Sequence, residues 1–590
     1  MRPSVPLAAW RARSWPLAVL IALAPLWLVG ILDRGLWTPD EPREADIAWR
    51  MSQQTNHLLP QLAGKPFLEK PPLSYWLSAA GISAFSQPRA PNIVYAIVTA
   101  VAVGATAGAM ADAGAAFLSA LLAGSLLMAF RASVWLAPDA CLLAGSALAL
   151  AGAYRGYTAA PGRTKLGGYT LMHLGAAIGF MAKSAPGWLV PALALLTLIA
   201  WERKWSELLR IELYAGLVVQ ALIIGPWIYA VAVSPGGHDA LSALFWHNIV
   251  GRFTKLPGPA ALDYTTAHHN WPGKYFLELP VYLLPWTLLA IAALKRAWPC
   301  VRGTGPSATP WRFAIAATLP FLVILSLAAT ARDIYAAPAM LGMSLLIALW
   351  ARESQNNLTA TDRFALRGTR VLVAIIACVF AAFLLLLAAA DRLNYEPIDH
   401  LNEVIRISAA AVTIIVAAVA LRYAARAQRL SDVSSAVVCT FGAYAGALCV
   451  AGIAAFPAID QWQNLALLAD TVNYETHGES LALLDPDETT IAMLDYRLRT
   501  PSSVLDTAGG DAAHVVSDWF RLHGRRSRVL VLLPGHAPGG VTRFLSRYHP
   551  IASPGDGVAG ALATAGTASI VRRFELPQGR RYALLGPPAS

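Results

Sequence analysis

The sequence predicts an all-α polytopic membrane protein with about thirteen transmembrane helices and a small α/β domain at its C-terminal end. The 590-residue chain is 56% hydrophobic and 14% charged, whereas soluble globular domains contain roughly 25% charged residues. Apolar stretches near the length that crosses a membrane as a helix recur up to residue 456. The chain after that point lacks them, which indicates a separate domain.

The expected spans follow these apolar stretches in order. The first, residues 15–32, carries no charged side chain, and no small-residue cleavage site follows it. We therefore expect a retained span and not a removed signal peptide. The other expected spans are residues 91–110, 114–130, 133–152, 168–183, 185–201, 211–233, 276–294, 313–330, 335–351, 371–390, 405–421 and 434–456.

The distribution of Lys and Arg predicts the orientation of these spans. Basic residues gather in alternate loops, which is the pattern of loops on the cytoplasmic side. This bias accounts for the net charge of +11 without a nucleic acid partner. An odd number of spans, with the N-terminus inside, places the loop after the first span and the C-terminal tail on the outer face of the membrane. The five cysteines lie in spans or in a cytoplasmic loop, so no disulfide framework is expected.

Three segments are expected outside the membrane. The first, residues 33–90, should contain interfacial helices at 41–51 and 72–85. The second, residues 234–275, is rich in aromatic residues and histidine. The third, residues 457–590, is the α/β domain, and residues 1–456 form the membrane domain. Within the tail we expect strands at 490–494, 528–533, 568–574 and 581–585 and a helix at 512–522.

The segment Trp37–Glu44 in the first exterior loop carries the most informative acidic residues. Asp40 stands where a helix could begin, with Pro42 in its first turn. Asp40 could therefore cap that helix, because its carboxylate accepts orphan backbone N–H groups. It could also be a catalytic carboxylate that deprotonates or orients a nucleophile. The two roles are compatible.

Asp139 and two lysines extend this list. Asp139 follows Pro138 near the exterior start of a span, where it is either a helix cap or a site residue. Lys70 follows Glu69 and precedes two prolines, so it is placed to bind a lipid phosphate through charge-assisted hydrogen bonds. Lys183 ends a span, a position from which lysine commonly extends to the headgroups.

Arg252 and the segment Arg332–Tyr335 could complete a cationic site with Lys70. Alternatively, Arg332 and Asp333 form a surface ion pair, which contributes about 1 kcal/mol or less. The adjacent His268 and His269 give only weak support for zinc. Asp485-Pro486-Asp487 has the spacing of a metal-binding pair but reads as a turn. No metal and no cofactor are expected.

Considered together, these segments resemble the polyprenyl-phosphate-dependent glycosyltransferases of the GT-C superfamily. Within that superfamily the chain is most similar to the lipid A aminoarabinose transferases and their protein O-mannosyltransferase relatives. The resemblance covers residues 15–351, and its most specific part is the first-loop pattern from Pro39 to Leu77, with Pro138-Asp139 and Arg332–Pro338 further along.

The resemblance implies roles for individual residues. Catalytic roles fall to Asp40, Glu41 and Asp139. Binding of the carrier phosphate falls to Lys70, Arg252, Tyr335 and Arg332, and supporting roles to Arg43, Glu69 and Lys183. The chain departs from its relatives at Ala331, where they frequently have Lys.

The implied activity is inverting transfer of a sugar from a polyprenyl (undecaprenyl) monophosphate carrier to an acceptor on the periplasmic face. The expected partners are that donor, membrane lipid and either lipid A or a hydroxyl of protein or glycan, which would receive mannose or another hexose. A secondary transporter is an alternative, but transporters place ionisable sites near the midplane of two related halves. Here the charges cluster at one face and no repeat is visible. A binding scaffold that acts through its tail is the remaining alternative.

Overall fold

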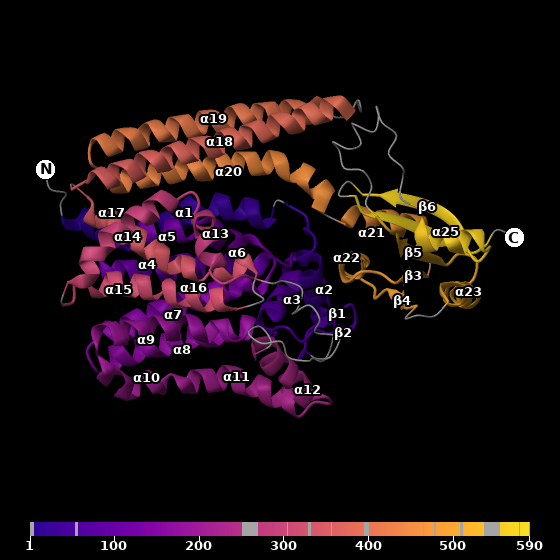
Figure 1. The fold of residues 1–590 in the computed structure, drawn as a ribbon, viewed down its shortest axis with the longest axis horizontal. Helices are drawn as coiled ribbons and strands as arrows, with labels where there is room; N and C mark the ends of the chain where they lie inside the picture. The colour runs from indigo at the N-terminus through magenta and orange to yellow at the C-terminus, as the bar shows by residue number, and fades with distance from the viewer. Residues whose placement is uncertain are drawn as a thin grey trace. The chain divides into compact units, whose positions relative to one another are not determined.

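The structure is a computed structural model that describes residues 5–32, 34–53, 57–250, 270–303, 305–328, 332–355, 357–394, 400–463, 465–476, 480–507, 511–535, 555–576 and 579–588. The chain divides into two compact units (Figure 1). The first unit comprises residues 1–33, 56–60 and 68–455, and the second comprises residues 34–55, 61–67 and 456–590. The first exterior loop is therefore shared between the units, which differs from the predicted assignment of the whole loop to the membrane domain.

The first unit is a bundle of helices. Within the described residues, seven helical segments are long and apolar enough to cross a membrane, or nine if two bent pairs each count as one span. The seven are built from α1 (Val5–Leu32), α4 (Ala90–Met110), α10 and α11 (Ile211–Ala215, Leu217–Ala232), α15 and α16 (Thr309–Ala316, Leu319–Leu327), α18 (Ala360–Asn394), α19 (His400–Arg429) and α20 (Val433–Gln463). The bent pairs are α5 and α6 (Ala113–Ala123, Leu127–Val134) and α13 and α14 (Lys274–Tyr282, Thr287–Arg302).

The remaining helices of the first unit are shorter or more polar. They are α3 (Leu73–Phe85), α7 (Pro138–Thr158), α8 (Arg163–Lys183), α9 (Pro186–Glu202), α12 (Gly237–Leu241) and α17 (Ala339–Glu353), together with η1 (Trp205–Leu209), η2 (Ser242–Val250) and η4 (Asp333–Ala336).

Each of the thirteen predicted spans overlaps helix within the described residues, but several consist of two helices, and two helix pairs are sharply bent. The pair α5 and α6 bends by 68°, and the pair α13 and α14 bends by 115°. Pro285 lies between α13 and α14, where its ring removes a backbone donor and clashes with the preceding turn. The prediction of one uninterrupted span at 276–294 is therefore wrong.

Glycines hold α7 and α8 against each other. A Cβ atom added to Gly152 of α7 would lie 2.2 Å from the backbone nitrogen of Met172, and one added to Gly175 of α8 would lie 2.3 Å from that of Ala149. Both distances are shorter than atoms can tolerate, so the two backbones approach each other where only hydrogen fits. Small residues at such seams let membrane helices gain dispersion energy over a long contact.

The second unit combines part of the first loop with the C-terminal domain. It contains α2 (Asp40–Gln53), α21 (Ala466–Thr476), α22 (Glu488–Leu498), α23 (Ala512–His523) and α25 (Gly557–Thr564), and the strands β1 (Gln61–Leu62), β2 (Lys65–Pro66), β3 (Leu481–Leu484), β4 (Ser503–Leu505), β5 (Arg528–Leu532), β6 (Ser569–Glu575) and β7 (Arg581–Gly586). The larger sheet has the strand order β4-β3-β5-β7-β6; β3 pairs in parallel with β4 and β5, and β7 pairs antiparallel with β5 and β6.

The predicted α/β domain is confirmed, with one element wrong. Residues 490–494, predicted as a strand, lie within α22, although Thr490 and Ile491 are β-branched, which favours strands. Asp487 caps this helix, accepting a hydrogen bond from the Thr490 backbone nitrogen at 2.7 Å. The cap overrides the local strand preference. Asp485 accepts hydrogen bonds from the backbone and hydroxyl of Thr507, so both aspartates of the Asp-Pro-Asp turn have structural partners.

Helices are present at both positions predicted in the first loop, as α2 and α3. Between them, β1 and β2 form a hairpin whose two turn residues, Ala63 and Gly64, both have positive φ, at 52° and 79°. This is the geometry of a tight two-residue turn. Asp46 of α2 accepts a hydrogen bond from the Ala63 backbone nitrogen at 2.9 Å, which fastens the hairpin to the helix.

One arginine joins α2 to α22. Arg50 contacts Asp46 at 3.0 Å and also pairs with Asp495 of α22. Both carboxylates are fully buried. Burial raises the pKa of Asp46 from 3.8 to about 7, against the opposing effect of Arg50, and it raises the pKa of Asp495 as well. Two buried acids thus share a single cation.

We expect Gly168→Ala to destabilise the first unit by about 1–3 kcal/mol, because its Cβ would lie 2.4 Å from the Gly156 backbone nitrogen. Gly167, the preceding residue of α8, would place an added Cβ in open space, with no atom within 4 Å, and is the matched control. Gly167→Ala should be neutral or stabilising, since alanine favours helix. Thermal unfolding of the two purified variants measures this, and equal losses would contradict close packing at Gly168.

The second prediction concerns pH. Because the folded state holds a proton on Asp46 that the unfolded state releases near pH 4, the free energy of unfolding should fall as pH rises from about 4 to 7, by up to about 1.4 kcal/mol per pH unit. Asp46→Asn should flatten this slope. Asp470→Asn, which removes an exposed partner of Arg497, is the control and should leave the slope unchanged. An unaltered slope in Asp46→Asn would exclude Asp46 as its source.

Candidate active site

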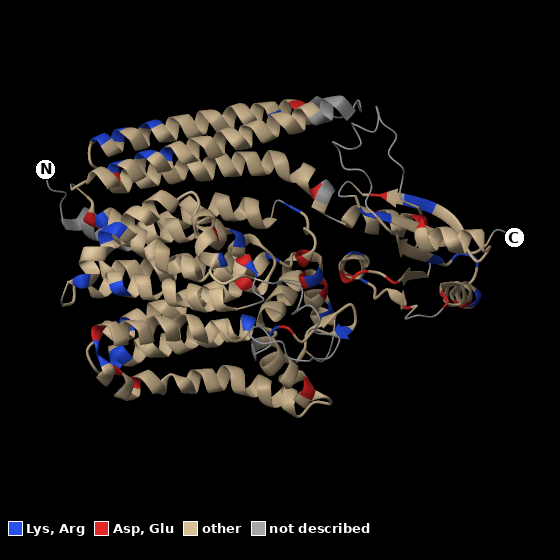
Figure 2. Ribbon diagram, viewed as in Figure 1, with Lys and Arg blue, Asp and Glu red and all other residues tan. Residues whose placement is uncertain are grey.

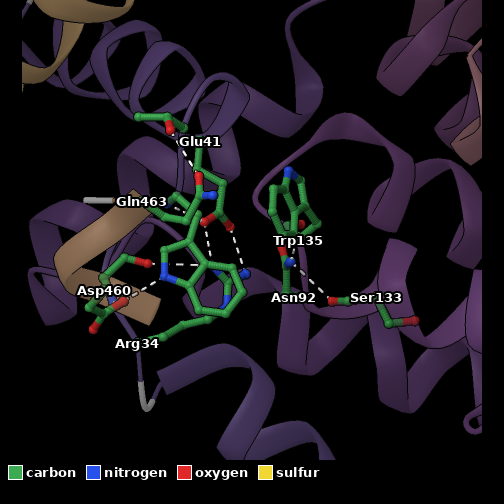
Figure 3. Close-up of polar contacts among 10 residues, drawn as sticks. Arg34, Glu41, Asn92, Ser133, Trp135, Asp460 and Gln463 are labelled. Carbon is green, nitrogen blue, oxygen red and sulfur yellow. Dashed lines mark hydrogen bonds and ion pairs between the residues drawn. The ribbon is translucent and has the colours of Figure 1, made fainter. Parts of the chain in front are cut away.

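The acidic motif of the first loop lies in the second unit, and its geometry starts with a buried ion pair. Arg34 holds both oxygens of Glu41, with Nη2 at 2.8 Å from Oε1 (Figure 3). The Glu41 carboxylate also accepts a hydrogen bond from the Trp37 backbone nitrogen at 2.8 Å. Glu41 is completely buried. Its contacts fix the path of the chain from residue 34 to residue 41.

The end of α20 closes the same loop. Asp460 accepts hydrogen bonds from the Gly35 backbone nitrogen at 2.9 Å and from the Trp37 indole at 2.5 Å. Gln463 accepts from the backbone and the hydroxyl of Thr38, each at 2.9 Å (Figure 3). These four hydrogen bonds position the turn that immediately precedes Asp40.

Asp40 is the first residue of α2 and is half-buried. Its neighbour Glu41 points to Arg34, so the two acids of the motif have different surroundings. Glu41 holds the loop through these contacts, and catalytic roles for Asp40 and Glu41 stay predictions. Arg43 pairs with Glu488 at 2.9 Å, which is again a contact within the second unit.

Two of the four residues predicted for phosphate binding, Lys70 and Tyr335, line a cavity of about 100 Å³ in the first unit. Polar side chains line one part of it and apolar side chains from α9 and α16 line the rest. The lining residues are Glu69, Lys70, Lys183, Ser184, Ala185, Pro186, Leu189, Asn248, Phe321, Ile324, Leu325, Ala328 and Tyr335. Lys70 and Tyr335, which are 265 positions apart in the sequence, thus meet at one cavity, as the resemblance implies.

Lys183 is the most constrained charge at this cavity. It forms an ion pair with Asp139, and both side chains are more than nine-tenths buried. Its ammonium also lies 3.8 Å from the ring centroid of Tyr335, within the range of a cation–π interaction. The expectation that Lys183 extends to the headgroups is therefore wrong: it joins the end of α8 to the start of α7.

Two hydrogen bonds position the segment before Asp139. The Asn92 side chain at the start of α4 donates to the carbonyl oxygens of Ser133, at 3.0 Å, and Trp135, at 2.8 Å (Figure 3). They fix the chain three residues before α7 begins at Pro138.

Ser184 is a pocket residue that sequence reasoning missed. It follows α8 with φ at +63°, a conformation that costs a non-glycine residue energy. Its side chain is 94% buried, and its hydroxyl finds no hydrogen-bond partner in the part of the chain that the structure describes. Buried polar groups are rarely left unpaired. Because Ser184 has a strained backbone and an unpaired hydroxyl and lines the same cavity as Lys70 and Lys183, its hydroxyl is a candidate to bind an anion.

Asn248 is a second residue that the sequence did not single out. It belongs to the π-helix η2 and donates to the Leu68 carbonyl at 2.5 Å and to the Ala243 carbonyl at 2.9 Å. The first of these bonds holds the turn that carries Glu69 and Lys70. The structure draws attention to Asn248 because π-helical turns are frequent at functional sites. No sequence pattern predicts such a turn.

Other predicted site residues lie elsewhere. Arg252, His268, His269 and Ala331 fall outside the described residues. Arg332 is not among the described residues that line the cavity; its carbonyl accepts a hydrogen bond from Tyr275 at 2.9 Å. Asp333 pairs with Arg131 of α6 at 2.5 Å, a partner that the predicted Arg332–Asp333 pair did not include.

The cavity joins two chemistries. Lys70 and Lys183 supply positive charge, and the first turn of α9 adds the positive end of a helix dipole. Phe321 and Leu325 of α16, a segment apolar enough to span a membrane, supply a hydrophobic wall. An amphiphile with an anionic head and an apolar chain matches this combination.

Comparisons with known proteins show what this chain is similar to. Residues 69–229 match the family model described as dolichyl-phosphate-mannose-protein mannosyltransferase. An undecaprenyl phosphate-alpha-4-amino-4-deoxy-L-arabinose arabinosyl transferase from Pseudomonas paraeruginosa is 31% identical over 63% of this chain and 66% of its own length. The protein of the same name from Serratia proteamaculans is 28% identical over 58% of this chain and 60% of its own. The chain thus spans just under two thirds of these relatives.

The fold also has solved counterparts. The crystal structure of ArnT from Cupriavidus metallidurans bound to undecaprenyl phosphate superposes with a TM-score of 0.70 at 18% identity, covering 98% of this chain and 99% of that one. Its apo state gives 0.67 at 17% identity. At this identity the match establishes the fold. The chain is therefore similar in sequence to these membrane glycosyltransferases and has an ArnT-like fold.

Proposed function

We propose that the protein transfers a sugar from an undecaprenyl monophosphate carrier to lipid A, on the periplasmic face of the inner membrane. The observation that carries the proposal is the cavity in which Lys70, Lys183 and Tyr335 face an apolar wall from α9 and α16. A polyprenyl phosphate has a compact anionic head on a long hydrocarbon chain, so both parts of the cavity have a use. The names of the relatives support the same carrier and an aminoarabinose-type sugar.

The proposed reaction is a displacement at the anomeric carbon. An acceptor oxygen forms a bond to that carbon while the bond to the carrier phosphate oxygen breaks, and the phosphate leaves with the electron pair. Fixed positive charges stabilise the developing charge on the leaving oxygens, a role for Lys70 and Lys183. Attack opposite the leaving group inverts the configuration. Asp139 keeps Lys183 oriented through their ion pair, and Glu69 lines the same cavity.

Asp40 has a role that depends on the acceptor. A phosphate monoester of lipid A is already largely ionised near neutral pH, since its second proton leaves near pH 6. Asp40 would then position the nucleophile without removing a proton. A hydroxyl of protein or glycan would instead need a general base. We favour lipid A because the first-loop motif is most similar to that branch of the family.

Lipid A from cells that make the carrier-linked sugar, with and without this gene, should therefore differ by the mass of one added sugar. Asp40→Asn should abolish the added mass at unchanged protein abundance, because asparagine can cap α2 almost as well as aspartate but cannot act as a carboxylate. Mass spectrometry of extracted lipid A measures both. If Asp40→Asn still transferred the sugar, Asp40 would have no catalytic role and would serve only to cap α2.

The acceptor has its own discriminating outcome. If lipid A is unmodified while protein or glycan gains a hexose, the acceptor assignment is wrong and the GT-C reaction stands. In that case the rate should fall at low pH as Asp40 takes up its proton. If no acceptor is modified and the purified protein moves a solute across vesicles, the transporter alternative replaces the proposal.

The Ser184 hydroxyl should donate to the carrier phosphate. We expect Ser184→Ala and Ser184→Gly both to weaken undecaprenyl phosphate binding, by about 0.5–1.5 kcal/mol for a lost hydrogen bond, or more if the acceptor is charged. Glycine relieves the positive φ at this position, so Ser184→Gly separates backbone strain from the hydroxyl. Binding measured by native mass spectrometry should fall in both variants. If Ser184→Gly bound the carrier normally and Ser184→Ala did not, the backbone conformation at this position would matter for binding and the hydroxyl would not.

A further inference from the structure

Six arginines form two matching stripes on neighbouring helices. Three lie near the start of α18 and three near the end of α19, and both sets have the spacing i, i+4, i+7. They are Arg363, Arg367 and Arg370 on α18, and Arg422, Arg426 and Arg429 on α19. Residues with this spacing share one face of a helix. Figure 2 shows the basic residues gathered at one end of this helix pair, and the rest of both helices is almost free of charge.

The two stripes are close enough to act on each other. Helices α18 and α19 pack along their length, and the charge of Arg370 is repelled by those of Arg367 and Arg429. One guanidinium nitrogen of Arg370 is buried and has no hydrogen-bond partner among the described residues. The fold therefore holds like charges together and leaves a donor unused.

No acid described by the structure pairs with any of the six arginines. The carboxylates nearest in sequence are engaged elsewhere. Asp362 accepts from the Trp350 indole at 2.8 Å and lies 3.5 Å from Arg296. Asp432 accepts from the Ser435 backbone nitrogen at 3.0 Å and from the Gln355 side chain at 3.3 Å. A positive cluster without internal counter-charge favours an external anion.

Apolar surface continues from the arginines along both helices. Val371 and Ile375, one and two turns beyond Arg367, are 59% and 53% exposed, and Val419 and Tyr423 of α19 are 49% and 60% exposed. These helices are apolar enough to span a membrane, so such side chains would contact hydrocarbon chains. Guanidinium groups next to a hydrocarbon-facing surface match the head and tails of a membrane lipid.

We propose that Arg367, Arg370 and Arg429 form a binding site for the phosphate of an anionic phospholipid, of the phosphatidylglycerol or cardiolipin class. Basic pockets between spans on the cytoplasmic side are suited to such headgroups, and the positive-inside bias puts this end of α18 and α19 there. Arginine suits the task because its planar fork donates two parallel hydrogen bonds to phosphate.

This lipid site is distinct from the cavity that Lys70 and Lys183 line. Helix α17 begins just after Tyr335, which lines that cavity. Near its other end, Arg352 donates a hydrogen bond to Ser434 of α20, close to the end of α19. The 15 residues of α17 separate the two ends by about 20 Å. The proposal therefore does not depend on the proposed glycosyl transfer.

The test uses full-length protein purified in a neutral detergent and titrated with phosphatidylglycerol, with phosphatidylcholine or with inorganic phosphate. The variant is the triple substitution Arg367→Gln, Arg370→Gln and Arg429→Gln. The matched control, Arg163→Gln, Arg203→Gln and Arg210→Gln, removes three exposed arginines from the same predicted side of the membrane. Bound lipid is counted by native mass spectrometry, and stabilisation is followed by thermal unfolding.

We expect phosphatidylglycerol, and not phosphatidylcholine or inorganic phosphate, to stabilise the wild type and the control at similar concentrations. The triple variant should need at least about ten-fold more phosphatidylglycerol for the same stabilisation. Without lipid, that variant should be as stable as the wild type or more so, because repulsion is removed. Equal lipid affinity in variant and control, equal effects of the two lipids, or the same effect from inorganic phosphate would overturn the proposal. So would a loss of stability in the lipid-free triple variant.

Discussion

The cost of burying charge governs the parts of this protein that matter for function. An isolated ion in a low-dielectric interior is so unfavourable that it must find a partner or lose its charge. Glu41 finds Arg34, Asp139 finds Lys183, and Asp46 and Asp495 share Arg50. Except for Asp46 and Arg50, which lie one turn apart on α2, each pair joins residues that do not share a helix. The shape of the first loop and the approach of α7 to α8 at the cavity both follow from these partnerships.

Much of the fold could be predicted from the sequence, because hydrocarbon imposes one strong rule on length and polarity. That rule located helix at each predicted span. It could not foresee the bend between α13 and α14, where Pro285 acts locally, nor the change of residues 490–494 from strand to helix. In the second case the helix cap formed by Asp487 outweighed the strand preference of two β-branched residues. Residue propensities do not show which of these two effects is the stronger.

The residues of the candidate site likewise divide into those that could be predicted from the sequence and those that could not. Lys70 and Tyr335 could be predicted because a motif resemblance carried them, and the structure brings both to one cavity. The partner of Lys183 could not, since Asp139 lies 44 residues away and only packing brings them together. Ser184 gave no sequence signal at all; its interest comes from a backbone angle and an unused hydroxyl. Glu41 shows the converse, an acid in the right motif whose contacts are structural.

The attachment of the first loop to the end of α20 has a consequence for biosynthesis. Gly35 and the carboxylate of Asp460 are separated by 425 residues. At roughly 5–20 residues per second, the ribosome needs about 20–85 s to make the second partner after the first has emerged. During that interval the first-loop motif exists without Asp460, Gln463 or Asp495, so the partners that surround its buried acids in the folded protein have not yet been made. The loop therefore completes its fold only after residues 460–495 have been made, and not when the neighbouring first span forms.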